Sequence, residues 1–160
     1  MADPIVIYTD GGASGNPGPG GYGVVMRYKN HQKEISEGFQ LTTNNRMELL
    51  AVIIALEQLK THNMPVRIYT DSKYVADAVE KGWLANWQRK QFKKVKNPDL
   101  WQRFLRIYTK LTDIKFNWVK GHAGNELNER ADRLAVEAYK LPGLKEDTGY
   151  VQQNGTLLDG

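Results

Sequence analysis

The sequence predicts an α/β domain built on a central five-stranded mixed sheet that is flanked by helices. Three observations support this fold class. Short apolar, β-branched segments alternate with amphipathic segments in the order three strands, helix, strand, helices, strand, helix. The chain has 160 residues, of which 41% are hydrophobic and 25% charged, as in an ordinary globular domain with its own core. No long repeat, linker or low-complexity segment is present, so we expect one domain over residues 1–160.

The first half of the chain supplies three predicted strands and one predicted helix. Residues 4–9 are apolar and β-branched, which is typical of a buried strand, and Asp10 ends this run. The stretch 11–23 holds seven glycines and two prolines and therefore predicts a loop. Helical spacing of apolar residues begins near Glu48. These signals place strands at 4–9, 23–28 and 34–41, a turn at Asn30-His31, and a helix at 48–59.

The second half supplies two further strands and the remaining helices. Ser72 follows the fourth strand as a helix cap, and Asn97-Pro98 combines a cap with a proline at the first helical position. The tail from about residue 145 to 160 is polar and contains glycine, so we expect it to be loose. The predicted elements are strands at 66–70 and 114–119, helices at 72–81, 83–90 and 97–110, and a last helix that begins at Asn125 or Asn128 and stops at Pro142-Gly143.

The composition limits the chemistry that the chain can perform. Without cysteine it has no disulfide and no thiolate metal site, so a metal ion would be bound through oxygen or histidine nitrogen, and oxygen ligands favour Mg2+ or Mn2+. We recognise no signal segment and no membrane span, and we expect a cytoplasmic protein. The net charge of +4 is compatible with nucleic-acid binding. Positive charge is concentrated between Trp83 and Trp101, at Arg89, Lys90, Lys93, Lys94 and Lys96, before the first acid at Asp99.

The tetrapeptide Ile-Tyr-Thr-Asp occurs twice, at residues 7–10 and 68–71. Each copy ends an apolar strand and places an aspartate, Asp10 or Asp71, at the carboxyl edge of the predicted sheet, where ligands of open α/β sheets gather. If the two strands are parallel neighbours, these carboxylates lie roughly 5 Å apart. Two like charges so close favour a bound cation or a shared proton. The alternative is that each aspartate only begins a turn or caps the next element.

Three further residues could join these aspartates, although each also has a structural explanation. Glu48 could complete a capping box with Asn45 at the start of a helix. Asp132 lies beside the apolar stripe of the last predicted helix, where it could simply pair with a neighbouring arginine. His122 lies in a glycine-flanked loop, as a structural histidine or as a mobile imidazole that moves protons and helps to displace a metal ion.

Several multi-residue motifs, in this order, resemble those of the type 1 ribonucleases H, especially the bacterial form, ribonuclease HI. The resemblance runs from about Ile5 to Tyr150 and implies the ribonuclease H-like fold, a five-stranded mixed sheet with flanking helices. The motifs are YTDG (8–11), GNPGPGGYG (15–23), TTNNRMEL (42–49), TDS (70–72), WVKGHAG (118–124) and NERAD (128–132).

The resemblance implies an endonuclease that hydrolyses the RNA strand of RNA–DNA hybrids and leaves 5′-phosphate and 3′-hydroxyl ends. It also implies two Mg2+ ions per active site with substrate, for which Mn2+ can substitute. Asp10, Glu48, Asp71 and Asp132 would be the metal ligands, with Asp10 between the ions and Glu48 and Asp71 on the side of the attacking water. His122 would be an auxiliary group. We expect a monomer without an obligate protein partner.

The resemblance also indicates where a hybrid duplex would bind. Short polar side chains near the start of the first predicted helix suit the 2′-hydroxyl and a DNA phosphate, although they also cap and turn. The basic segment suits phosphates generally. Within it we expect Trp83 to be largely buried and Trp87 to face the DNA. The expected substrate-binding residues are Asn16, Thr43, Asn44, Asn45, Lys73, Trp87, Arg89, Lys90, Lys93 and Lys94.

Some positions depart from the bacterial pattern and leave details of substrate contact open. Lys73 and Asp77 stand where glutamines are common, and Ala13 stands where a cysteine is frequent. The basic segment is a few residues shorter, with Gln91-Phe92 in place of a Gly-Trp pair. Two other functions would share some of these features. A Holliday-junction resolvase or integrase core would share the acids, and a non-catalytic hybrid-binding module would share the basic segment.

Overall fold

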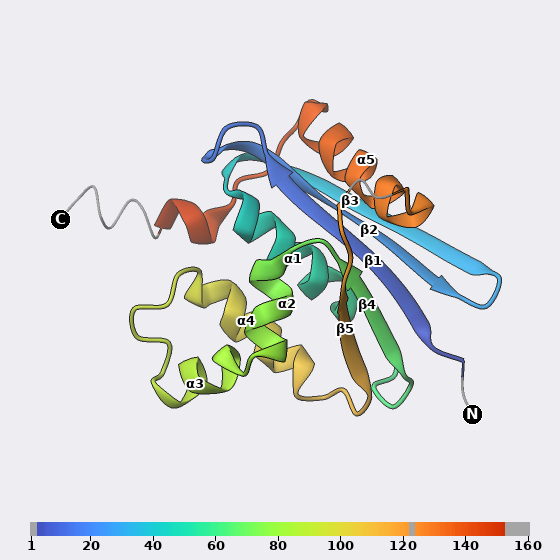
Figure 1. The fold of residues 1–160 in the computed structure, drawn as a ribbon. Coiled ribbons are helices and arrows are strands. Elements are labelled where there is room, and N and C mark those ends of the chain that lie inside the picture. The colour runs from blue at the N-terminus through green and yellow to red at the C-terminus, as the bar shows by residue number, and fades with distance from the viewer. Residues whose placement is uncertain (1–2, 122–123, 153–160) are drawn as a thin grey trace.

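The computed structural model describes residues 3–121 and 124–152, which form a five-stranded sheet in the order β3-β2-β1-β4-β5 (Figure 1). The pairs β1–β2 and β2–β3 are antiparallel, whereas β1–β4 and β4–β5 are parallel. The mixed sheet predicted from the sequence is therefore confirmed. The strands are β1 (Ile5–Ala13), β2 (Gly18–Tyr28), β3 (His31–Thr42), β4 (Val66–Thr70) and β5 (Ile114–Trp118).

The helices lie on both faces of the sheet (Figure 1). Helix α5 packs on β1, β2 and β3 from one side, and α1 packs on β1 and β2 from the other, where α4 covers α1. No helix among the described residues is long and apolar enough to cross a bilayer. The helices are α1 (Asn44–Glu57), α2 (Lys73–Glu80), α3 (Trp83–Arg89), α4 (Pro98–Tyr108) and α5 (Glu126–Lys140).

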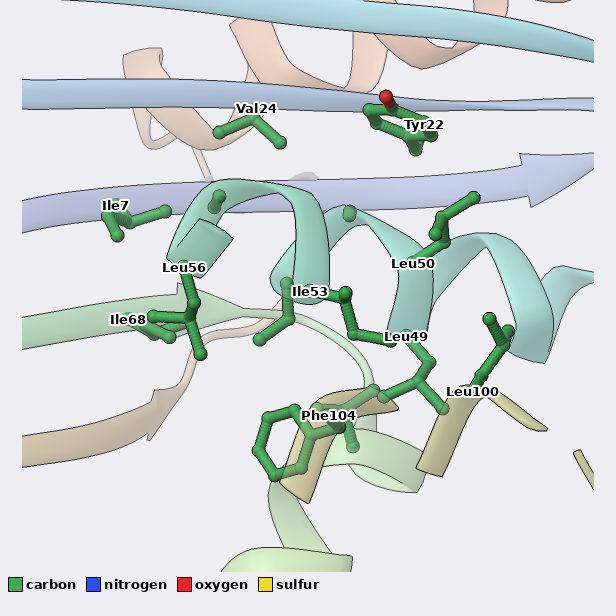
Figure 2. Packing of buried hydrophobic residues seen from close by; sticks show 14 of the residues in the cluster. Ile7, Tyr22, Val24, Leu49, Leu50, Ile53, Leu56, Ile68, Leu100 and Phe104 are labelled. Carbon is green, nitrogen blue, oxygen red and sulfur yellow. The ribbon is translucent and has the colours of Figure 1, made fainter. Parts of the chain in front are cut away.

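The main core lies between α1, the sheet and α4 (Figure 2). Leu49, Ile53 and Leu56 recur at helical spacing along α1 and are fully buried. They pack with Ile68 of β4 and Phe104 of α4 in one cluster. Each such side chain stabilises the fold by roughly 1.5–3 kcal/mol when it is withdrawn from water. This packing holds α1, and with it Glu48, in a fixed position against the sheet.

Most of the glycine-rich stretch is strand, which corrects the prediction of a loop over residues 11–23; only residues 14–17 connect the two strands. β1 continues past Asp10 to Ala13 and pairs with β2, which already begins at Gly18. A side chain at Gly11 would collide with the backbone of Met47 and Glu48, and one at Gly23 would collide with the Ala131 carbonyl of α5. These glycines therefore let α1 and α5 approach the strands closely. Asp10 lies inside a paired strand and not at its end.

Two other boundaries differ from the predicted ones in ways that affect the site. The helix expected from residue 48 begins one turn earlier, because the Thr43 hydroxyl accepts a hydrogen bond from the Arg46 amide at 3.3 Å and caps α1. Glu48 is therefore not part of a capping box with Asn45. At the other end of the chain Asn125, and not Asn128, caps α5, since its side chain accepts from the Asn128 amide at 3.0 Å.

Residues 145–152 are held against the domain, contrary to the expected loose tail. The Lys145 amide donates to the Gly38 carbonyl at 3.0 Å, the Gln40 amide donates to the Lys145 carbonyl at 2.8 Å, and residues 148–152 are helical. Asp147 is buried, and its carboxylate accepts hydrogen bonds from Thr42 at 2.7 Å and from Arg46. The last part of the expected tail, residues 153–160, lies outside the described residues.

Candidate active site

The two Ile-Tyr-Thr-Asp segments lie side by side in register. β1 and β4 are parallel, and Tyr8 pairs with Tyr69 while Thr9 pairs with Thr70. The two tyrosine rings stack with their centroids 4.8 Å apart. Asp71 directly follows β4, so that its side chain meets that of Asp10 at one edge of the sheet. The expectation that the repeated tetrapeptide brings two carboxylates together is confirmed.

Glu48 completes a cluster of three carboxylates. One carboxylate oxygen each from Asp10, Glu48 and Asp71 lies within 4.8 Å of the others. Glu48 reaches the edge from α1, one turn beyond the helix start, where Gly11 lets the helix backbone lie against β1. Asp132 of α5 is within hydrogen-bonding reach of the Asp10 carboxylate. The four acids expected from the sequence therefore meet at one place.

Without a cation, the close approach of these carboxylates destabilises the protein, and a bound cation would relieve their repulsion. Burial, followed by the charges of Asp10 and Asp71, raises the pKa of Glu48 well above its ordinary value. Burial and the neighbouring Asp71 likewise raise the pKa of Asp10. Among the described residues no group hydrogen-bonds the buried Oε2 atom of Glu48. An oxygen-only set of clustered carboxylates with such an unpaired buried atom fits a hard divalent cation such as Mg2+.

Glu48→Gln should stabilise the metal-free protein at neutral pH by about 0.5–2 kcal/mol, because it removes a buried charge from among like charges. A carboxyl whose pKa is raised on folding contributes stability below its unfolded pKa, near 4.5 for glutamate, and this contribution is lost as pH rises through the folded value. The gain should therefore shrink toward pH 4. Thermal melts of the variant and the unmodified protein in EDTA at several pH values measure this gain in stability. Equal melting temperatures at pH 8 would contradict the idea that the charge of Glu48 destabilises the metal-free protein.

Two of the asparagines expected to bind substrate also fasten the segment 13–17 to α1. The Asn16 side chain accepts a hydrogen bond from the Asn44 amide at 3.0 Å, and the Asn44 side chain accepts one from the Ala13 amide at 2.7 Å. Asn16, Asn44 and Asn45 are exposed around the start of α1, the helix that carries Glu48, and Thr43, which caps this helix, is partly exposed. The side-chain oxygens of Asn16 and Asn44 hold residues 13–17 against α1, and the exposed side-chain N–H groups remain available for a ligand. The structural and the substrate-binding explanations are thus compatible.

The basic residues expected to contact phosphate surround one open pocket. It has a volume of about 530 Å³ and is lined from α3 and the following loop, including Trp87. Trp83 is 42% exposed, so the expectation that it is buried was wrong. Trp87 turns inward instead, with its ring 5.3 Å from that of Trp101, although one edge still lines the pocket. Arg89, Lys90, Lys93 and Lys94 are all exposed around it.

Gln91→Gly should stabilise the protein by about 0.5–1 kcal/mol, because Gln91 has a φ of 54°, a left-handed conformation that is unfavourable for any residue with a Cβ. Gln91 is exposed, so no buried contact is lost. Urea unfolding measures the change. The matched control is Gln88→Gly, an exposed position inside α3, where the same substitution should cost about 1 kcal/mol. A loss of stability at both positions would refute the argument from φ.

One buried arginine that the sequence reasoning did not single out anchors the start of α1, the helix that carries Glu48. Arg46 is 1% exposed and precedes Glu48 by two residues in α1. Its guanidinium donates to Asp147 at 2.7 Å and to both carboxylate oxygens of Asp99 at 2.9 and 2.7 Å. It also donates to the Asn97 side chain at 3.2 Å. The start of α1 is therefore joined to the start of α4 and to the C-terminal segment.

The loop after β5 approaches the cluster from the remaining side. A Cβ at Gly121 would lie 2.8 Å from the Asp71 carboxylate, so a larger residue there would displace that carboxylate. His122, expected as an auxiliary group, lies outside the described residues. Lys73 is exposed at the start of α2, with its ammonium 5.0 Å from the centre of the Trp118 ring. The sequence reasoning did not single out Trp118, because the alternation along β5 would place it on the buried face with Phe116, whereas the structure leaves it exposed.

Known proteins share both the sequence and this arrangement. The family profile described as RNase H matches residues 2–140. A ribonuclease H of Desulforamulus reducens is 57% identical over 148 residues, which cover 89% of this chain and 92% of the relative. One of Trichodesmium erythraeum is 51% identical over 151 residues, covering 91% and 95%.

Solved structures agree with the sequence relatives. LC9-RNase H1, a type 1 RNase H with the type 2 active-site motif, superposes with a TM-score of 0.78 at 30% identity, over 88% of this chain and 74% of that one. LC11-RNase H1 in complex with an RNA/DNA hybrid superposes with a TM-score of 0.63 at 35% identity, over 85% and 96%. The chain therefore belongs to the ribonuclease H family of enzymes and resembles its bacterial ribonuclease HI members.

Proposed function

We propose that this protein is an endonuclease that hydrolyses the RNA strand of RNA–DNA hybrids by two-metal-ion catalysis, leaving 5′-phosphate and 3′-hydroxyl ends. The observation that carries the proposal is the cluster of Asp10, Glu48 and Asp71 with Asp132 beside it, in a chain of the ribonuclease H family. The likeness to LC11-RNase H1, which was solved with an RNA/DNA hybrid, supports the choice of substrate. We also propose a cytoplasmic monomer without an obligate protein partner.

In the proposed mechanism the four acids would be shared between two ions. Asp10 contacts the other acids and would contribute to both ions, Glu48 and Asp71 to one, and Asp132 to the other. When bound, Mg2+ or Mn2+ supplies a water of lowered pKa and stabilises the charge on the leaving 3′ oxygen. The protein side of the site keeps the carboxylates fixed, because Asp10, Glu48 and Asp132 lie within a strand or helix and Asp71 directly follows β4.

Side chains outside the cluster would hold and select the duplex. Asn16, Asn44 and Asn45 offer polar groups next to the acids, where they can read the 2′-hydroxyls of the RNA strand. Thr43 and the N-terminus of α1 suit a DNA phosphate. His122 would move protons or assist the release of a metal ion. Trp87 and the cations Lys73, Arg89, Lys90, Lys93 and Lys94 would contact the backbones of the duplex.

A cleavage assay with three labelled duplexes tests the proposal. RNA–DNA hybrid, duplex DNA and duplex RNA are each incubated with the protein in Mg2+ or in EDTA. Only hybrid with Mg2+ should be cut, only in its RNA strand, and the products should carry 5′-phosphates that a phosphatase removes. Equal cleavage of duplex DNA would favour a resolvase or integrase activity. Tight binding of hybrid without any cleavage would favour a non-catalytic hybrid-binding module.

A further inference from the structure

An exposed tryptophan holds the backbone of one metal-ligand candidate. Trp118 is the last residue of β5 and pairs with Thr70, the residue before Asp71. Its indole Nε1 donates to the Asp71 carbonyl at 2.9 Å, although the side chain is 46% exposed. The next amide, that of Val119, donates to the Thr70 carbonyl at 2.9 Å. Two adjacent hydrogen bonds from the end of β5 therefore fix the turn that carries Asp71.

The same turn is fastened from its other side. The Ser72 amide donates to the Thr70 hydroxyl at 3.0 Å, and the Ser72 hydroxyl caps α2 by accepting from the Val75 amide at 3.2 Å. Of all these contacts, the indole hydrogen bond is the one that acts on Asp71 itself. Loss of that donor would leave the hydrogen bonds of Thr70 and Ser72 in place and remove one restraint on the peptide that follows Asp71. The direction of the Asp71 carboxylate depends on that peptide.

The exposed ring of Trp118 also has a cation over it. The Lys73 ammonium lies 5.0 Å from the ring centre, in a geometry that attracts a cation to the π face. No ion pair among residues 3–121 and 124–152 involves Lys73, so its charge is not neutralised by a carboxylate there. It is two residues from Asp71, beside a cluster of negative charge that repels phosphate. A cation fixed at this point can offset that repulsion.

We propose that Trp118 is a positioning residue with two separate effects: its indole N–H orients the metal ligand Asp71, and its ring holds Lys73 in place for a phosphate of the RNA strand near the cleaved bond. The second effect rests on the proposed function, whereas the first concerns the metal site alone. The two effects use different parts of the side chain. Trp118→Phe keeps an aromatic face and removes the N–H, and Lys73→Gln removes the cation and keeps the N–H.

Metal affinity and the turnover rate test the first effect. Trp118→Phe should bind Mg2+ about tenfold more weakly in calorimetry without substrate, as is usual when a group that orients a metal ligand is lost. Its kcat at a fixed Mg2+ concentration should fall by a similar factor, while KM for hybrid stays within twofold. Mg2+ affinity and kcat within twofold of the unmodified protein would overturn the assignment of Trp118. The calorimetric result stands even if the protein does not cut hybrids.

The salt dependence of hybrid binding tests the second effect. Fluorescence anisotropy in EDTA gives the slope of log K against log salt, and the size of this slope should decrease by about one for Lys73→Gln, as expected when one phosphate contact is lost. The matched control is Lys29→Gln. Lys29 follows β2, and its ammonium lies 5.5 Å from the centre of the Tyr28 ring, so this substitution also removes a cation held over an aromatic ring. Lys29 is six residues along the chain from Gly23, the partner of Asp10 in β2. Equal slopes for the two variants would overturn the role of Lys73. Failure of unmodified protein to cut hybrid would instead refute the proposed function.

The ring itself is tested by combining substitutions. In a Trp118→Leu background, Lys73→Gln should change hybrid affinity less than it does in the unmodified protein, because the lysine has lost the surface that holds it. If Lys73→Gln has the same effect in both backgrounds, the ring does not position the lysine and this part of the proposal fails.

Discussion

Asp10→Asn should reduce hybrid cleavage about a thousandfold or more while hybrid binding persists, because in the proposed two-metal mechanism several kcal/mol of transition-state stabilisation would depend on ions held at this cluster. Asp10 is the acid that meets all the others, since it lies within the triad and beside Asp132. The substitution keeps the shape of the side chain and removes its charge. Single-turnover cleavage in Mg2+ measures the rate, and anisotropy in EDTA measures the binding.

Two comparisons make this result interpretable. Asp113→Asn removes one acid at the opposite end of β5, where it pairs with Arg67 at 3.0 Å, and should leave cleavage unchanged. Hybrid binding by Asp10→Asn in EDTA should equal or exceed that of the unmodified protein, because a charge that repels phosphate has been removed. A variant that retains more than a tenth of the cleavage rate would show that Asp10 is not a shared ligand.

Asp147→Ala should lower the free energy of unfolding by about 3 kcal/mol, the lower part of the range for breaking a buried ion pair. Asp147 is 8% exposed and accepts two hydrogen bonds from Arg46, whose guanidinium would be left buried with Asp99 as its one remaining charged partner among the described residues. Thr42 would also lose its acceptor. Urea unfolding in EDTA measures the loss, free of any contribution from bound metal.

An exposed ion pair provides the control for this prediction. Glu34→Ala breaks the pair between Glu34 and Arg130, which is joined at 2.8 Å on the surface, and should cost less than about 1 kcal/mol. The buried network also has a pH signature. Burial opposes ionisation of Asp99, but Arg46 outweighs it and lowers the pKa of Asp99, so this contribution is lost as pH falls below about 4. Equal losses of unfolding free energy for Asp147→Ala and Glu34→Ala would show that the buried Arg46 does not depend on Asp147.

Local patterns were sufficient to predict the elements and two of the acids. Alternation, β-branching and caps identify strands and helices, and the repeated tetrapeptide predicts that Asp10 and Asp71 meet, because parallel pairing in register brings equivalent residues of the two strands to the same level. The glycines of residues 11–23 misled the prediction. Glycine usually marks a loop, but here Gly11 and Gly23 are strand residues that are small because helices lie directly against them.

The remaining features depend on contacts between distant parts of the chain. Sequence spacing cannot decide that Thr43 caps α1, so that the helix begins at Asn44 and Glu48 belongs to the carboxylate cluster and not to the helix cap. Nor can it decide which of Trp83 and Trp87 turns inward, since both lie on α3 and the choice depends on where Trp101 packs. The contact between Arg46 and Asp147 spans 101 positions and has no local signal.

The in-register stack of Tyr8 on Tyr69 has a consequence for how the chain reaches its native state. Parallel strands with identical side chains could pair in shifted registers, and a shift of two residues would preserve which face is buried. Such a shift would move the two aspartates apart by about 6–7 Å along the strands. A misaligned molecule would then lack the cluster of carboxylates. If the cluster binds a divalent cation, as proposed, that ion would stabilise only correctly aligned chains, and cation binding would also serve as a check on folding fidelity.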